Sequence, residues 1–393
     1  MKTVRLRSIL LLVVVSLFTT GCWNRLELNE QALVMASGVD ATDDGKLLLT
    51  DQVILPTNLS KGQSTMRQKF ITVSAIGRNM MEAGQNLQTK LSRKYFLGHR
   101  RIIFVGEKLS QHGLGNIMDQ FLRNPDARLR SDLFVVKNDT AVHALQIPSP
   151  LEQYPSLAVI KSRKFVGGTS ETTLLSFLME YVSPTSSPTL PVVEIVPESP
   201  DSNDKTFSFS GRAIFNKQLK LVGYLNYSEA SYRFWIMNTV TNRQVTFEVG
   251  NGNGLSTIDC SQFKSSIRPI VNNGHLRYVI TLGAQGLLRE SETDLKLKTP
   301  KELNLLERSA EQEVTQKVSH LISTVQHEYG TDIFGFDRAV ARKYPRQWEG
   351  MKNHWDEIFP DIPVQIKAHI TIKVVGLTSE SVAAPKQTVR RGW

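Results

Sequence analysis

The sequence predicts an α+β fold: a three-domain body in which mostly antiparallel or mixed sheets carry packed helices. Strand and helix patterns alternate over residues 33–137, which indicates a sheet covered by helices. Residues 207–225 alternate with period two around a turn at Asn216-Lys217, which is typical of an antiparallel hairpin. From Leu303 to Tyr329, apolar residues recur every three or four positions, which predicts one long amphipathic helix.

The composition is that of a globular protein whose stability must come from hydrophobic cores. Its 393 residues are 40% hydrophobic, and 47 Lys+Arg stand against 37 Asp+Glu, a net charge of +10. Two cysteines cannot form a disulfide scaffold, and the C-x-x-C spacing typical of zinc sites is missing from the sequence. We therefore expect no metal site and treat Cys260 as a small buried hydrophobe.

The N-terminus has the pattern of a lipoprotein signal peptide over residues 1–21. Basic residues at 2–7 precede an apolar run at 9–18, which is too short for a membrane-spanning helix of about 20 residues. The run ends in Thr19-Thr20-Gly21-Cys22, and small residues before a cysteine resemble a lipobox. Cys22 is then the lipid attachment site, and its two acyl chains tether a soluble body to the bilayer. The alternative is an ordinary secretory signal that is cleaved nearby, with Cys22 a free thiol.

The first predicted domain covers residues 22–200 and is α/β-like. It ends in a run with five prolines at 183–204, which we interpret as a linker with a boundary near residue 200. Its predicted elements are a hairpin at 33–56, strands at 69–75, 101–105 and 133–137, and helices at 79–91, 114–122, 156–164 and 172–181.

Two further domains are predicted, a small β-rich one at 201–270 and an α+β one at 271–378. Gly330 ends the long helix of the last domain, and Thr331 or Asp332 caps a second helix at 333–343. A third helix at 347–359 and a strand at 364–375 follow, and residues 379–393 are predicted to be a disordered tail. Within the second helix, Phe334 and Phe336 are expected to be buried anchors.

No catalytic constellation is recognisable, so we predict a protein that is not an enzyme and has no cofactor. The G-x-S-x-G elbow is missing, and His327-Glu328 lacks the second histidine of a zinc-protease helix. The glycines at 250–254 lack the Lys-Ser/Thr of a phosphate loop, which favours a turn.

A basic stretch at 61–101 carries nine Lys or Arg against Glu82 alone, a local balance of +8. Such a face suits anionic lipid or acidic loops of a membrane partner, and nucleic acid is not expected outside the membrane. The residues proposed for this contact are Arg93, Lys94, Arg100 and Arg101. The alternative is a solvated face without a partner.

Four motifs in order resemble the Ger(x)C lipoproteins, the C subunits of spore germinant receptors. They are GCWNRLELNE at 21–30, ASGVD at 36–40, KLVGYL at 220–225 and DIFGF at 332–336, followed by Pro345, Trp348, Trp355 and 359–360.

The resemblance implies a non-catalytic subunit on the outer surface of the spore inner membrane. It implies a complex with a membrane-embedded A subunit and a transporter-like B subunit, which nutrients trigger to start germination. The alternatives are a solute-binding lipoprotein of a membrane transporter and an envelope hydrolase. The first needs two similar doubly wound lobes around a cleft.

Overall fold

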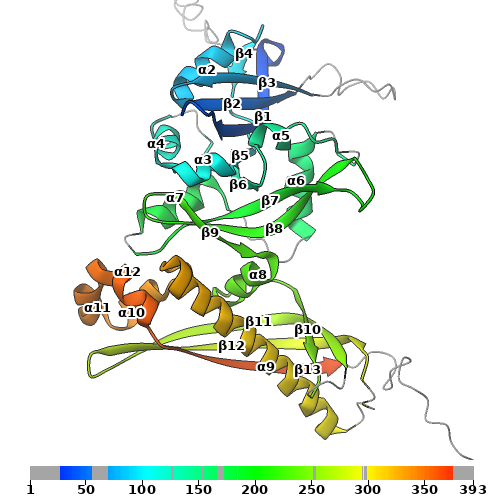
Figure 1. The fold of residues 1–393 in the computed structure, drawn as a ribbon, viewed down its shortest axis with the longest axis vertical. Coiled ribbons are helices and arrows are strands. Elements are labelled where there is room, and N and C mark those ends of the chain that lie inside the picture. Colours follow the sequence, from blue (N-terminus) through cyan, green and yellow to red (C-terminus); the bar gives the residue numbers. More distant parts are fainter. Residues whose placement is uncertain are drawn as a thin grey trace, which may run out of the picture.

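Two sheets, each covered by helices, are arranged along the long axis of the molecule (Figure 1). The computed structural model describes residues 27–54, 70–124, 128–149, 151–152, 154–165, 172–183, 185–250, 254–293, 295 and 299–374. The signal peptide, Cys22 and the tail at 379–393 therefore lie outside the described residues. We call the part built on the first sheet the first body and the part built on the second sheet the second body.

The first sheet is mixed, with strand order β3-β2-β1-β5-β6-β7-β8-β9 and with β4 paired to β1. Parallel pairing joins β1, β5, β6 and β7, whereas β2 and β3 at one edge and β8 and β9 at the other are antiparallel. The strands are β1 (Gln31–Ala41), β2 (Leu47–Ile54), β3 (Phe70–Gly77), β4 (Lys94–Phe96), β5 (Ile102–Gly106), β6 (Asp132–Lys137), β7 (Thr189–Pro197), β8 (Lys205–Phe215) and β9 (Leu221–Asn226).

Helices cover both faces of this sheet, which is why β5 and the residues 133–136 of β6 are apolar. One face packs against α2 (Met80–Gln88), α3 (Glu107–His112), α4 (Gly115–Arg123) and α7 (Leu174–Val182). The other face packs against α5 (Ala141–Ala144) and α6 (Pro155–Phe165).

The second body has a four-stranded sheet crossed by the long helix α9 (Figure 1). Its strands, in order across the sheet, are β10 (Arg243–Glu248), β11 (Leu255–Asn272), β12 (His275–Ser291) and β13 (Val364–Val374). The first three are antiparallel, and β13 runs parallel to β12. Helix α8 (Tyr227–Ile236) follows β9 directly and packs into the core of the second body.

Helix α9 (Pro300–Thr324) confirms the predicted amphipathic helix. Thr299 and Glu302 form a capping box at its start, and a π-helical turn extends it to Tyr329. Gly330 has φ +59°, so it ends the helix in a left-handed conformation that suits glycine. The predicted apolar stripe lies in the core: residues Leu306, Ala310, Val314, Val318, Leu321 and Val325 are fully buried.

Three shorter helices complete the second body: α10 (Phe336–Lys343), α11 (Pro345–Met351) and α12 (Trp355–Ile358). The predicted helix at 333–343 thus begins three residues later, and the predicted helix at 347–359 is interrupted by a 3₁₀ turn at Lys352–His354. Phe334 and Phe336 are 2% and 0% exposed, which confirms the prediction that they are core anchors.

The α+β class with packed helices is confirmed, but strand pairing contradicts the predicted boundaries at 200 and 270. Strands β7 and β8 lie on either side of residue 200 and pair from Thr189↔Ile214 to Pro197↔Lys205. The segment 201–270 supplies β8 and β9 to the first sheet and β10 and β11 to the second. The two sheets therefore divide between β9 and β10, because β8 and β9 pair onward from β7 whereas β10 pairs with β11.

Candidate functional site

The predicted contact residues lie at the end of the first sheet where the described chain begins. Lys94 is exposed at the start of β4, which pairs in parallel with the start of β1 through Gln31↔Lys94. Arg101 is exposed, and its backbone N–H donates to the carbonyl of Met35 on β1 at 2.8 Å. Arg93 is partly buried. These three residues share one end of the first body with Gln31.

Arg100 is not part of this surface, which corrects the prediction for that residue. Its side chain is 2% exposed, and its guanidinium reaches the Ser37 hydroxyl at 3.5 Å and lies over the Phe121 ring. Burial lowers the pKa of Arg100, while the nearby charge of buried Asp51 opposes that shift. Arg100 therefore balances a buried carboxylate in the core of the first sheet, a role that sequence spacing does not reveal.

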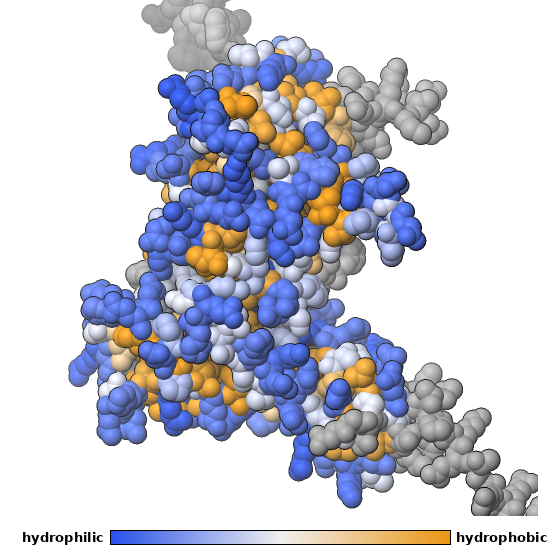
Figure 2. Space-filling view, in the orientation of Figure 1, coloured by the Kyte–Doolittle hydropathy of each residue, from blue (hydrophilic) through white to orange (hydrophobic). Residues whose placement is uncertain are grey.

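A cleft of about 700 Å³ lies between the β1–β2 turn and helices α2, α3 and α4. Its cations are already paired with carboxylates. Lys108 contacts Asp43 at 2.5 Å, and Arg123 contacts Asp119 at 2.9 Å. Figure 2 shows mostly hydrophilic side chains on this part of the first body and smaller hydrophobic patches elsewhere on the same face. Because these charges pair with one another, the lining of the cleft does not indicate a class of ligand.

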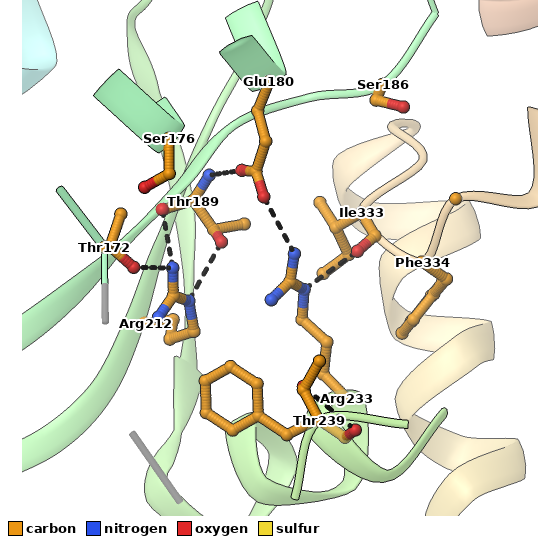
Figure 3. A network of polar contacts seen from close by, with 12 residues as sticks. Thr172, Ser176, Glu180, Ser186, Thr189, Arg212, Arg233, Thr239, Ile333 and Phe334 are labelled. Carbon is orange, nitrogen blue, oxygen red and sulfur yellow. Dashed lines mark hydrogen bonds and ion pairs between the residues drawn. The ribbon is translucent and has the colours of Figure 1, made fainter. Parts of the chain in front are cut away.

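A buried polar network joins the two bodies, and its first centre is Arg212 on β8 (Figure 3). The Nε of Arg212 donates to the Thr189 hydroxyl at 2.9 Å. One Nη donates to the Thr172 hydroxyl at 2.9 Å and to the Thr189 carbonyl at 2.7 Å. Burial, reinforced by the charge of Arg233, lowers the pKa of Arg212 to about 9. The side chain ties β8 to β7 and to the residue preceding α7.

The second centre is Arg233 on α8, which reaches across to both bodies (Figure 3). Its Nε donates to the carbonyl of Ile333 in the second body at 2.8 Å. Its Nη2 lies 4.0 Å from the carboxylate of Glu180 on α7 in the first body. Glu180 also accepts the backbone N–H of Thr189 at 3.2 Å. Glu180 therefore balances the charge of two buried arginines, and burial lowers the pKa of Arg233.

The segment 331–337, which contains the DIFGF motif, forms the other side of this junction. The carboxylate of Asp332 accepts the backbone N–H groups of Phe334, Gly335 and Asp337 at 2.9 to 3.0 Å. The carboxylate of Asp337 accepts hydrogen bonds from Thr185 and Ser186, which precede β7 in the first body. Burial, with a contribution from the Asp337 charge, raises the pKa of Asp332 to about 7. The N-cap residue of α10 is Gly335, so the prediction that Thr331 or Asp332 caps this helix is wrong. Asp332 instead fixes the turn that precedes the helix.

The junction uses its polar groups to bind main chain and hydroxyls. In the described part of the chain, no cluster of three or more His, Cys, Asp or Glu could hold a metal ion. Cys260 is 1% exposed, and burial raises the pKa of its thiol to about 12, as expected for a small hydrophobe. Among the described helices, none has the length and apolar character that a membrane crossing requires.

These features define a two-body α+β protein whose buried polar groups form a structural junction, and comparison with solved proteins finds the same fold. The structure entitled "Crystal Structure of the GerBC protein" matches with a TM-score of 0.58 at 21% identity. The match covers 86% of this chain and 96% of that one. The two sheets differ in strand number and order, unlike the paired similar lobes that a solute-binding lipoprotein needs.

Sequence comparison identifies the family. The model "Spore germination protein N-terminal domain" matches residues 24–195, and "Spore germination B3/GerAC like, C-terminal" matches residues 210–376. The chain belongs to this family of spore germination proteins.

Its relatives include spore germination proteins KC and B3 of Bacillus subtilis, at 26% and 24% identity. These alignments cover 92% and 95% of this chain and 94% and 98% of the relatives. Spore germination protein GerQC of Bacillus cereus is 22% identical over 94% of this chain and 99% of its own length.

Proposed function

We propose that this chain is the lipid-tethered, non-enzymatic C subunit of a nutrient germinant receptor. In this proposal it triggers spore germination with two integral membrane partners, the A and B subunits. One observation carries the proposal: the chain aligns along 92% or more of its length with spore germination proteins KC and B3. The proposed location is the outer surface of the spore inner membrane.

The position of the first body supports a tether at Cys22. Cys22 precedes Gln31 by nine positions, so an extended link spans at most about 30 Å. Because Lys94 pairs with Gln31, the basic end of the first sheet stays close to the bilayer when Cys22 is acylated. Arg93, Lys94 and Arg101 can then contact anionic headgroups or acidic loops of the membrane subunits.

The tether is tested by palmitate labelling of Cys22→Ala, which we expect to carry no label. The same chain with Cys260→Ala is the matched control, since it removes the other cysteine of the sequence. Label retained by Cys22→Ala, or lost in the Cys260→Ala control, would contradict lipid attachment at Cys22.

The contact surface is tested by reversing Arg93, Lys94 and Arg101 to Glu and measuring co-purification with the A and B subunits from spore membranes. We expect reduced co-purification with little change in stability, because Lys94 and Arg101 are exposed, and exposed charges usually change stability by less than about 0.5 kcal/mol. The control reverses three exposed basic residues of the second body: Lys301, Arg308 and Lys367. Equal co-purification of both variants would show that Arg93, Lys94 and Arg101 make no contact with the membrane subunits.

A further inference from the structure

A groove of about 550 Å³ on the second body lies between the C-terminal end of α8, strand β11 and helix α10. Its wall and floor include Phe334 and Gly335 of the DIFGF motif. Along its rim lie residues with free hydrogen-bonding or charged groups: Asn238, Ser266, Arg338 and Arg342. No acidic residue lines it. The groove thus has a positive lining.

Arg338 and Arg342 are one helical turn apart on α10, so their side chains project from the same face of the helix. Both are exposed, and within the described residues neither has a hydrogen bond or an ion pair. This differs from the cleft of the first body, where the cations have carboxylate partners. The nearby carboxylates of Asp332 and Asp337 are buried and already accept hydrogen bonds from the junction.

Gly335 sets the position of the first of these arginines. Its φ is +78°, and a Cβ atom there would lie 2.9 Å from a terminal guanidinium nitrogen of Arg338 and 3.1 Å from its Nε. The guanidinium therefore lies directly beside the glycine, while the side chain as a whole stays exposed. This close approach needs the missing side chain, so the motif glycine aims Arg338 over the groove.

We propose that this groove is the docking site for an acidic segment of a partner protein, with two of its carboxylates paired to Arg338 and Arg342. Guanidinium groups bind carboxylates through two parallel hydrogen bonds, and a pair at i,i+4 matches two acidic side chains on one face of a segment. Asn238 and Ser266 can bind the polar groups between them.

The location favours a protein segment over lipid headgroups. The groove belongs to the second body, whereas β1, at whose start the chain leads toward Cys22, belongs to the first body at the other end of the molecule (Figure 1). That the partner is another receptor subunit rests on the proposed function. Such a subunit would extend away from the bilayer to reach the groove.

The test measures binding of a short fluorescein-labelled peptide of alternating glutamate and serine to the full chain in detergent, by fluorescence anisotropy. We expect the double variant Arg338→Gln, Arg342→Gln to lose affinity about tenfold or more. The matched control Arg308→Gln, Arg346→Gln removes the same charge outside the groove and should stay within about twofold of the wild type. The double variant Arg338→Glu, Arg342→Glu should instead bind the corresponding lysine peptide.

Three results would overturn the docking site: no binding of the glutamate peptide to the wild type, equal loss in the control variant, or displacement of the peptide by inorganic phosphate at equal concentration. The last result would identify a small-anion site. This assay uses neither membrane nor germination. If the peptide binds but the A and B subunits do not co-purify, the proposed function is refuted and the docking site is not. If the subunits co-purify but the peptide does not bind, the docking site is refuted and the proposed function is not.

Discussion

Arg233→Met should loosen the connection between the two bodies. The guanidinium of Arg233 is 4% exposed and holds the Ile333 carbonyl of the second body and the Glu180 carboxylate of the first. Methionine retains much of the apolar stem and the contact with neighbouring rings, but it removes the charge and the donors. The substitution leaves the buried carbonyl of Ile333 without this hydrogen-bond donor. Arg212 is then the one remaining arginine of this network near Glu180.

The magnitude follows from the two interactions and the desolvation of the charge. The hydrogen bond from a charged donor contributes about 1.5 to 3 kcal/mol. The attraction to Glu180 at 4.0 Å is at most about 4 kcal/mol at an effective dielectric constant of 20, and the 28% exposure of the Glu180 side chain reduces it. Removing the guanidinium recovers several kcal/mol of desolvation. We expect the free energy of unfolding to fall by about 3 kcal/mol, the lower end for a broken buried pair.

Urea titration of the full chain in detergent, followed by tryptophan fluorescence, measures this change. The matched control is Arg289→Met, which breaks an ion pair with Asp259 that is shorter, at 3.0 Å, but whose arginine side chain is 55% exposed. Exposed pairs contribute about 0 to 1 kcal/mol, so the control should change little. If Arg233→Met costs no more than Arg289→Met, the inference that this network holds the bodies together is wrong.

Three further predictions concern the segments around the junction. Phe336→Ala should lower the free energy of unfolding by about 4 kcal/mol in the same titration, because the ring is fully buried and stacks on Tyr278 at 4.5 Å; an unchanged midpoint would contradict its core role. Because burial raises the folded-state pKa of Asp332 to about 7, above the ordinary range of an aspartate, the folded state binds more protons between about pH 4 and 7. Stability should fall as pH rises through that window, and a pH series in which Asp332→Asn shows the same fall would exclude this carboxyl as the cause. Gly223→Ala places a Cβ 2.2 Å from the Tyr329 ring and should cost about 1 to 3 kcal/mol, with partial recovery in the double variant with Tyr329→Ala.

The sequence pattern predicts correctly those elements that are defined within a single helix or a single hairpin. The stripe from Leu306 to Val325 follows from the helical period alone, and Gly330 ends the helix because its conformation is left-handed. The hairpin predicted at 33–56 is likewise formed by β1 and β2.

The interpretation of the proline-rich run at 183–204 as a linker is wrong, because residues 189–197 form β7, which pairs with β8 directly after it and with the distant strand β6. Pro191 lies inside β7, but β6 pairs with β7 only from Val192 onward, so the missing N–H of Pro191 costs that pairing nothing. Pro197 stands at the end of the strand. Proline content here is therefore compatible with a strand of the first sheet and does not mark a gap between domains.

The sequence by itself determined the α+β class, the long helix and its limits, the buried phenylalanines of the DIFGF motif and the resemblance to a germination family. Each depends on residues close together along the chain, where period and backbone conformation act directly. Tertiary structure alone decided that Arg100 is buried beside Asp51, and that Arg212 and Arg233 meet at Glu180. Those roles depend on which distant strands and helices become neighbours, because burial and charge pairing are properties of the assembled core.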